Sequence, residues 1–185
     1  EFVTGLEKLS QLMKVEANIK VGSLWEYTRD VWSQGYEHPE YFKAYHVGVV
    51  CEDIERALQE KKHYAAILPR FHLKSTVVGY SFITWLSLKA KLDVSSLYLS
   101  YSDSMSAYHI SEIKAHIRKN PQLTEWMSDL APHAEIACRY EIQGKRCKIL
   151  HGGLFTFKRG IHVNGALIAD DILRDPENPL DFTQL

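Results

Sequence analysis

The stretch from Leu68 to Thr76 constrains the fold of this chain more than any other. It reads Leu-Pro-Arg-Phe-His-Leu-Lys-Ser-Thr, with an apolar run before it, Tyr64 to Leu68, and another after it, Val77 to Leu88. A strand, a tight loop, Lys-Ser/Thr and a helix follow one another in this order in phosphate-binding loops. Both glycines of the usual pattern are replaced here, by Leu68 and Leu73. An ordinary strand, turn and helix with a surface lysine is therefore the alternative interpretation.

The chemistry of a phosphate-binding loop gives each part of this stretch a role. The start of the helix offers unpaired N–H groups and a partial positive charge to an anion. Lys74 would supply a charge to the outer phosphates of ATP, and the Ser75 hydroxyl could hold Mg²⁺. Leu73 fits such a loop if its φ is negative, although a side chain there limits how closely the backbone wraps a phosphate. The candidate nucleotide-binding residues are Pro69, Arg70, Phe71, His72, Leu73, Lys74, Ser75 and Thr76.

A second candidate site element is the apolar run Ala166 to Asp171, which ends in two carboxylates. Enzymes with a phosphate-binding loop need one acid to orient Mg²⁺ and a neighbour to polarise the attacking water. A strand that carries acids at its C-terminal end delivers them where α/β folds bind ligands. We expect Asp170 on the magnesium side and Asp171 to act on the water. Two solvated aspartates at a strand end are the alternative.

Composition excludes several classes of protein. The formal net charge of −1 gives the 185-residue chain no overall attraction to nucleic acid, so any DNA contact has to be local. No run approaches the roughly 18 apolar residues of a membrane span, and no signal peptide is recognisable at the N-terminus. Cys51, Cys138 and Cys147 form no CxxC pair, which favours reduced thiols in a cytosol. The nine histidines lack the spacing of a zinc site.

Strands and helices alternate along the chain, which favours a parallel sheet between helices. Helices are expected at 1–20, Leu24–Trp32, Glu40–Glu60, after Lys74, at Met105–Lys119 and at Leu123–Leu130, and strands at Tyr64–Leu68, Ser96–Tyr101, Ala134–Gln143, Arg146–His151 and Ala166–Asp171. The predicted fold is an α/β P-loop NTPase (RecA-like, ASCE) with a mostly parallel sheet, a β-hairpin insertion and a helical N-terminal appendage. Residues 1–38 would form the appendage and 39–185 the ATPase domain. The appendage either packs on the core or docks another subunit, and the sequence does not separate these readings.

Four stretches together resemble the large terminase subunits of tailed bacteriophages. The first is Pro69-Arg70-x-His72-x-Lys74-Ser75-Thr76, which resembles the P-R-G-H-G-K-S-T form of the loop. Leu97 to Asp103 resembles the second strand of that family and its serine-containing turn. The glycine-rich bridge from Gly152 to Gly160 and the run from Ala166 to Leu173 resemble the segment before the acidic strand and the strand itself. The resemblance covers roughly residues 40 to 177.

The resemblance implies the ATPase motor domain of a viral DNA-packaging machine, which hydrolyses ATP with Mg²⁺ to move double-stranded DNA into a procapsid. It implies the portal protein and the small terminase subunit as partners, a homo-oligomeric ring on the procapsid, a monomer in isolation, the host cytoplasm as location, and no membrane. Arg159 matches the arginine that completes a neighbouring subunit's site, so the implied catalytic residues are Asp171, Arg159 and Lys74, with Ser75 and Asp170 for Mg²⁺. Arg70 would be a phosphate-side or sensor arginine. Because the family's coupling motif and nuclease domain follow the acidic strand, we expect both to be absent from this chain, which would be a truncated piece of such a protein.

Two other functions remain open at this point. A helicase-like ATPase would use Asp-Glu in its second motif and a second RecA-like domain, and this chain has Asp170-Asp171 instead. A non-hydrolysing nucleotide-binding assembly module is favoured by Leu68 and Leu73 in the loop. Turnover of ATP separates the motor from the module.

Overall fold

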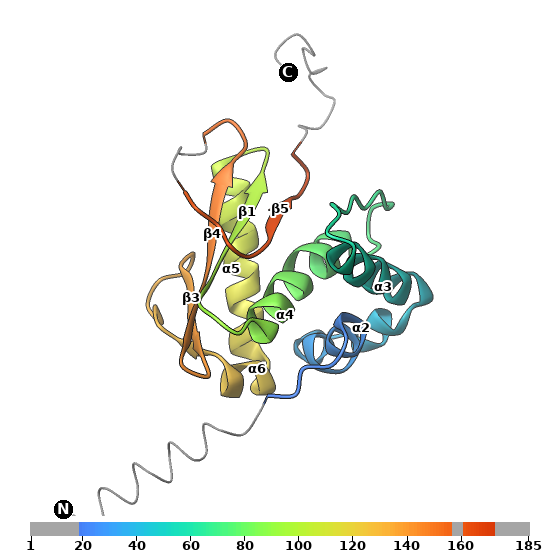
Figure 1. The fold of residues 1–185 in the computed structure, drawn as a ribbon, viewed down its shortest axis with the longest axis horizontal. Helices are drawn as coiled ribbons and strands as arrows, with labels where there is room; N and C mark the ends of the chain where they lie inside the picture. Colours follow the sequence, from blue (N-terminus) through green and yellow to red (C-terminus); the bar gives the residue numbers. More distant parts are fainter. Residues whose placement is uncertain (1–18, 157–160, 173–185) are drawn as a thin grey trace, which may run out of the picture.

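A five-stranded sheet forms one half of the fold in the computed structural model, which describes residues 19–156 and 161–172 (Figure 1). The strands lie in the order β2-β3-β4-β1-β5. Their bounds are β1 Val94–Ser100, β2 Ser128–Asp129, β3 Cys138–Ile142, β4 Lys145–Gly153 and β5 Leu167–Ala169. The described residues are therefore α/β in class, as the alternation of patterns predicted.

The sheet is mixed, so the prediction of a mostly parallel sheet is wrong. Strand β1 pairs in parallel with β4 and β5, whereas β3 pairs antiparallel with β2 and β4. The reason is the hairpin, which was expected as an insertion but belongs to the sheet itself, because β4 pairs with β3 along one edge and with β1 along the other. Gln143 and Gly144 both have positive φ, 51° and 75°, as a two-residue turn of this kind requires.

The expected strand at Tyr64–Leu68 is absent, since this segment joins none of the five strands. Burial nevertheless alternates along this segment: Tyr64, Ala66 and Leu68 are partly buried, while Ala65 and Ile67 are exposed. Tyr64 and Leu68 pack against the hydrophobic core without any ladder of backbone hydrogen bonds. Period-two burial thus comes here from packing on one side, and the strand expected from the apolar run before the loop does not form.

The helical elements fall near the expected places, with several shifted ends. They are α2 Leu24–Glu26, η1 Tyr27–Val31, η2 Trp32–Gly35, η3 Pro39–Lys43, α3 Tyr45–Gln59, η4 Ser75–Ser81, α4 Phe82–Lys89, α5 Asp103–Lys119 and α6 Pro121–Trp126. The single helix expected at Glu40–Glu60 is interrupted at Ala44, whose backbone is extended. Helix α5 is capped by the Ser102 side chain, which accepts a hydrogen bond from the Met105 amide. Helix α6 ends before Met127, because Ser128 and Asp129 pair with β3.

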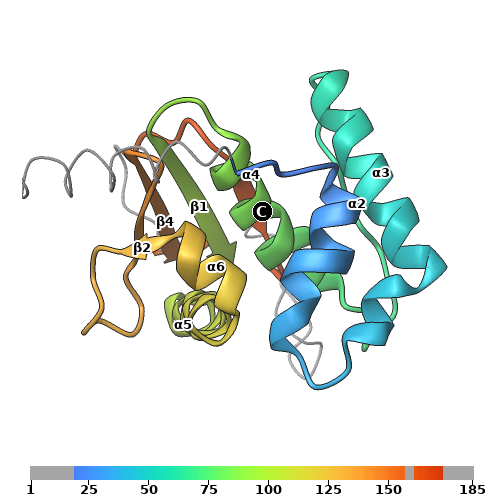
Figure 2. The same cartoon turned by 90° about the horizontal axis from the view of Figure 1, so that it is seen from below.

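Helix α5 covers one face of the sheet, and α4 lies between the sheet and the group formed by α2 and α3 (Figure 2). Ile110, Ile113 and Ile117 recur at helical spacing on α5 and are fully buried. On β3, the alternate residues Cys138, Tyr140 and Ile142 are buried, whereas Ile136 precedes the strand and is exposed.

The helical segment before the loop is part of the core over its described residues. Leu24, Tyr27 and Trp32 are almost completely buried. Hydroxyl groups join this segment to the helix that follows Lys74: Tyr27 Oη donates to Thr84 Oγ1 at 3.0 Å, and Thr28 Oγ1 lies 2.7 Å from Ser81 Oγ. Residues 24–35 therefore pack on the core; residues 1–18 of the predicted appendage lie outside the described part.

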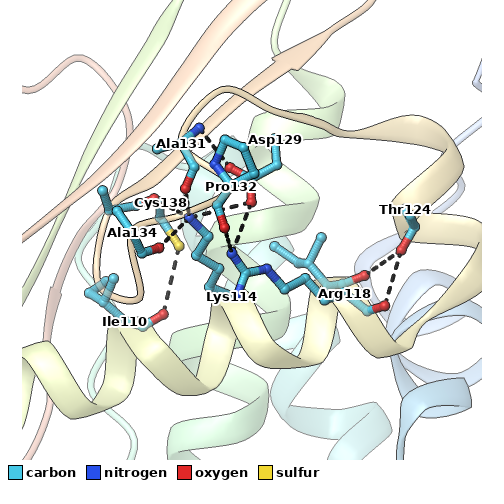
Figure 3. A network of polar contacts seen from close by, with 11 residues as sticks. Ile110, Lys114, Arg118, Thr124, Asp129, Ala131, Pro132, Ala134 and Cys138 are labelled. Carbon is cyan, nitrogen blue, oxygen red and sulfur yellow. Dashed lines mark hydrogen bonds and ion pairs between the residues drawn. The ribbon is translucent and has the colours of Figure 1, made fainter.

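A buried lysine fastens the loop between β2 and β3 to helix α5 (Figure 3). Lys114 Nζ donates to the carbonyl oxygens of Ala131, Ala134 and Ala137, the last two at 2.6 and 3.0 Å. It also lies 3.3 Å from a carboxylate oxygen of Asp129. All three protons of the ammonium group are satisfied, which is the condition for burying such a charge. Arg118 also donates to the carbonyl oxygen of Pro132, so the loop is held on α5 by two cations.

Candidate functional site

The helix that begins at Lys74 starts at the C-terminal edge of β5. Lys74 precedes η4, a π-helical stretch that continues directly into α4. Stretches of π-helix are uncommon and are frequently found at functional sites. The Val77 amide donates to the Leu73 carbonyl at 2.8 Å, which closes the first turn. The sequence prediction of a loop that turns into a helix at Lys74 is confirmed by this geometry, although no strand leads into the loop.

The structure brings Lys74 together with both acids at the end of β5. Lys74 Nζ lies 2.5 Å from Asp171 Oδ1 and 3.5 Å from Asp170 Oδ1. Asp170 is buried, whereas Asp171 is exposed. The hydrogen bond that Lys74 Nζ donates to Asp171 is the main cause that raises the pKa of Lys74, so the amine is protonated at neutral pH. A cation and two carboxylates that are far apart in the sequence thus form one charged cluster.

Unfavourable backbone conformations gather around this cluster. Phe71, Leu73 and Asp171 have φ of 65°, 57° and 42°, in the left-handed region where residues with a side chain are uncommon. Such residues cost of order 1–3 kcal/mol each and cluster at functional sites. The condition of a negative φ at Leu73 is not met, because the loop makes the left-handed turn that glycine usually makes. The Leu73 side chain packs against the core.

Phe71 allows a test of this strain. Its ring is fully exposed, so Phe71→Gly removes the left-handed penalty without removing packing. We expect the free energy of unfolding to rise by about 0.5–1 kcal/mol, measured by urea denaturation. The matched control is Phe155→Gly, at an exposed phenylalanine without positive φ, which should lower stability. Equal effects of both substitutions would contradict strain at Phe71.

Three aromatic residues behind the acids were not identified from the sequence. Tyr98 Oη donates to Asp170 Oδ2 at 2.8 Å, and Tyr80 Oη lies 2.6 Å from His109 Nδ1. The rings of Tyr98 and His109 are 5.1 Å apart between centroids. Burial lowers the pKa of His109, so the imidazole is neutral at neutral pH. One feature of the sequence indicates a role for Tyr98, because a tyrosine hydroxyl within an apolar strand needs a hydrogen-bonding partner.

The other candidate loop residues differ in how far they are exposed to solvent. Ser75 and Thr76 are partly buried in the first turn of the helix. Pro69, Arg70 and His72 are exposed, and His72 Nδ1 lies 2.9 Å from the Arg70 carbonyl oxygen. The His72 ring contacts the ring of His46 on α3, with 5.4 Å between centroids. Arg159, the predicted arginine finger, lies outside the described residues.

The described residues offer little other chemistry. Within residues 19–156 and 161–172, no three His, Cys, Asp or Glu side chains are grouped so that they could hold a metal ion by themselves. Cys51, Cys138 and Cys147 are free and buried, and burial raises the pKa of the Cys138 thiol to about 12. No helix in the same described ranges has the length and apolar character needed to cross a membrane.

Comparisons with known proteins add no relative to this geometry. No protein-family model matches the chain, and neither a curated protein nor a solved structure is significantly similar to it. The chemistry of the site therefore follows from its own residues.

Proposed function

We propose that this chain is an ATP-hydrolysing domain with its catalytic centre at Lys74, Asp170 and Asp171. The observation that carries the proposal is the approach of Lys74 Nζ to both carboxylates, 2.5 Å from Asp171 and 3.5 Å from Asp170. Lysine at a helix start and acids at a strand end are the parts that phosphoryl transfer requires on one side of a sheet. Strain at Phe71, Leu73 and Asp171 is a second support, since strain of this kind concentrates at functional sites.

The residues fit a nucleotide with Mg²⁺. Asp170 presents a buried carboxylate whose Oδ2 is bonded to Tyr98 and whose Oδ1 is turned toward Lys74. Ser75 follows Lys74 in the first turn of the helix, so its hydroxyl and the backbone N–H groups of that turn belong to the same helix start. The metal would neutralise charge on the phosphate oxygens, with Ser75 and Asp170 as its protein ligands.

Lys74 has to change partners when a nucleotide binds. Its ammonium group is held by Asp171, and the phosphates compete with that carboxylate for the same cation. Once released, Asp171 is free to accept a hydrogen bond from water and to orient it for in-line attack on the γ-phosphate. Arg159 would supply a further positive charge from a neighbouring subunit. The ion pair therefore links nucleotide binding to the release of the carboxylate that orients the attacking water.

The resemblance to large terminase subunits extends the proposal to a motor for double-stranded DNA. In that reading the domain works in a homo-oligomeric ring at the procapsid in the host cytoplasm, with the portal protein and the small terminase subunit. This part rests on the four sequence stretches and is tested separately from ATP hydrolysis. A helicase-like ATPase would share the chemistry at Lys74, and a non-hydrolysing assembly module would share only nucleotide binding.

The direct test is ATP binding and turnover by the wild type and by Lys74→Ala, with and without double-stranded DNA and a partner subunit. We expect Lys74→Ala to weaken binding at least 10-fold and to remove turnover, because the charge for the outer phosphates is lost. Lys62→Ala is the matched control, since Lys62 is also paired with a carboxylate, at 2.7 Å from Glu60, but lies outside the site. It should leave both quantities unchanged.

Each outcome decides between the functions. Absence of ATP binding by the wild type under every condition would refute the ATPase. Binding without turnover in the assembled ring would favour the assembly module. Turnover stimulated by DNA that depends on Lys74 but not on Lys62 would support the motor.

A further inference from the structure

We propose that Tyr98 is a positioning residue whose hydroxyl fixes the Asp170 carboxylate with one oxygen turned toward Lys74. Tyr98 Oη donates to Asp170 Oδ2 at 2.8 Å, while Oδ1 lies 3.5 Å from Lys74 Nζ. The two oxygens of one carboxylate are thus assigned to different partners. The catalytic meaning of this orientation rests on the proposed function, but the orientation itself does not.

The tyrosine also contacts α5 and η4. Its ring lies against the ring of His109 on α5, 5.1 Å away between centroids. On η4, a Cβ atom added at Gly79 would come within 2.8 Å of Tyr98 Oη and 2.9 Å of Cε2. Because Gly79 has no side chain, the phenol of Tyr98 has room beside the backbone of η4. Because Gly79 belongs to the helix that starts at Lys74, Tyr98 contacts that helix and the acid at once.

Burial explains why this hydrogen bond matters for Asp170. The carboxylate is almost completely buried, and a buried charge is costly unless its oxygens are hydrogen-bonded. Tyr98 itself is fully buried, so water does not compete with its hydroxyl. Without the hydroxyl, Oδ2 loses this donor and the carboxylate is free to rotate about its last torsion. Groups that orient a metal ligand in this way typically contribute about 10–100-fold to metal affinity.

A neighbouring tyrosine provides the control. Tyr80 is also buried and also lies beside His109, but its hydroxyl bonds to His109 Nδ1 at 2.6 Å and not to the acid. Tyr98→Phe and Tyr80→Phe each remove one buried hydroxyl and keep the ring. A general loss of packing or stability would affect both variants, whereas loss of the Asp170 orientation is specific to Tyr98→Phe.

The first measurement is the affinity for a fluorescent ATP analogue with Mg²⁺ and with EDTA. We expect Tyr98→Phe to lose about 10-fold in affinity with Mg²⁺ and to match the wild type in EDTA. Tyr80→Phe should match the wild type in both. An equal loss in Mg²⁺ and EDTA, or equal losses in the two variants, would overturn the positioning role.

The second measurement needs no nucleotide. In crystal structures of the wild type and of Tyr98→Phe, the Asp170 carboxylate should keep its orientation in the first and leave it in the second. An unchanged carboxylate in Tyr98→Phe overturns the proposal whatever the binding data show. If the wild type binds no nucleotide, the ATPase fails, and the crystal structures still decide the role of Tyr98.

Discussion

Asp171→Asn is expected to separate nucleotide binding from turnover. The substitution removes the charge that holds Lys74 Nζ at 2.5 Å, so the lysine becomes available to phosphate and affinity for ATP should rise a few-fold. The gain is modest because Asp171 is exposed and the ion pair is screened by solvent. Turnover in the assembled complex should fall by about 10²–10⁴-fold, because the group that orients the attacking water is lost. Asparagine tolerates the left-handed backbone of Asp171, so the fold should be preserved.

The matched control is Asp93→Asn. Asp93 is as exposed as Asp171 and lies 3.6 Å from an arginine, Arg146, near the opposite end of β1. The two variants carry the same charge change, so a general electrostatic effect on ATP binding would appear in both. Binding titrations and steady-state turnover of the two variants provide the comparison. Turnover that survives in Asp171→Asn at near the wild-type rate would remove Asp171 from the catalytic centre.

Of the substitutions named here, Lys114→Met should lower the free energy of unfolding the most. The substitution leaves the carbonyl oxygens of Ala131, Ala134 and Ala137 without their shared donor and removes the closest cation from Asp129. Breaking a buried pair of this kind costs about 3–5 kcal/mol. Arg118 retains a contact with Asp129 at 3.5 Å, so we expect a loss of about 3 kcal/mol in urea denaturation.

Lys148→Met is the control for removal of a lysine. Lys148 is exposed on β4, and its substitution should change the free energy of unfolding by no more than about 0.5 kcal/mol. Asp129→Asn separates the two contributions to the Lys114 site, since it removes the ion pair but keeps the three carbonyl contacts. Its loss should be smaller than that of Lys114→Met. A loss below about 1 kcal/mol for Lys114→Met would show that water replaces the ammonium group.

The sequence predicted those elements that depend on residues close together along the chain. The helix start at Lys74, the hairpin turn and the buried face of α5 follow from loop chemistry, positive-φ residues and helical periodicity. The meeting of Lys74 with Asp170 and Asp171 was also expected, because a lysine after a loop and acids after a strand point to the same edge of a sheet.

The features that the sequence did not predict depend on contacts between distant segments. Lys114 lies four residues after Ile110, on the buried face of α5, but its burial depends on carbonyl groups from the loop before β3. The role of Tyr98 depends on β5 arriving beside β1. Burial alternates along Tyr64–Leu68 as it does in a strand, but the segment pairs with none of the five strands of the sheet.

The hydroxyl pairs between the N-terminal helical turns and the helix of Lys74 have a mechanical consequence. Tyr27 with Thr84 and Thr28 with Ser81 join the two segments side by side, and Trp85 Nε1 adds a bond to the Gly22 carbonyl at 3.2 Å. Sliding one segment along the other would leave buried hydroxyls without partners, which costs about 1–3 kcal/mol for each group. A force on residues 22–28 is therefore passed to the helix that carries Lys74, because these contacts join the two segments into one unit.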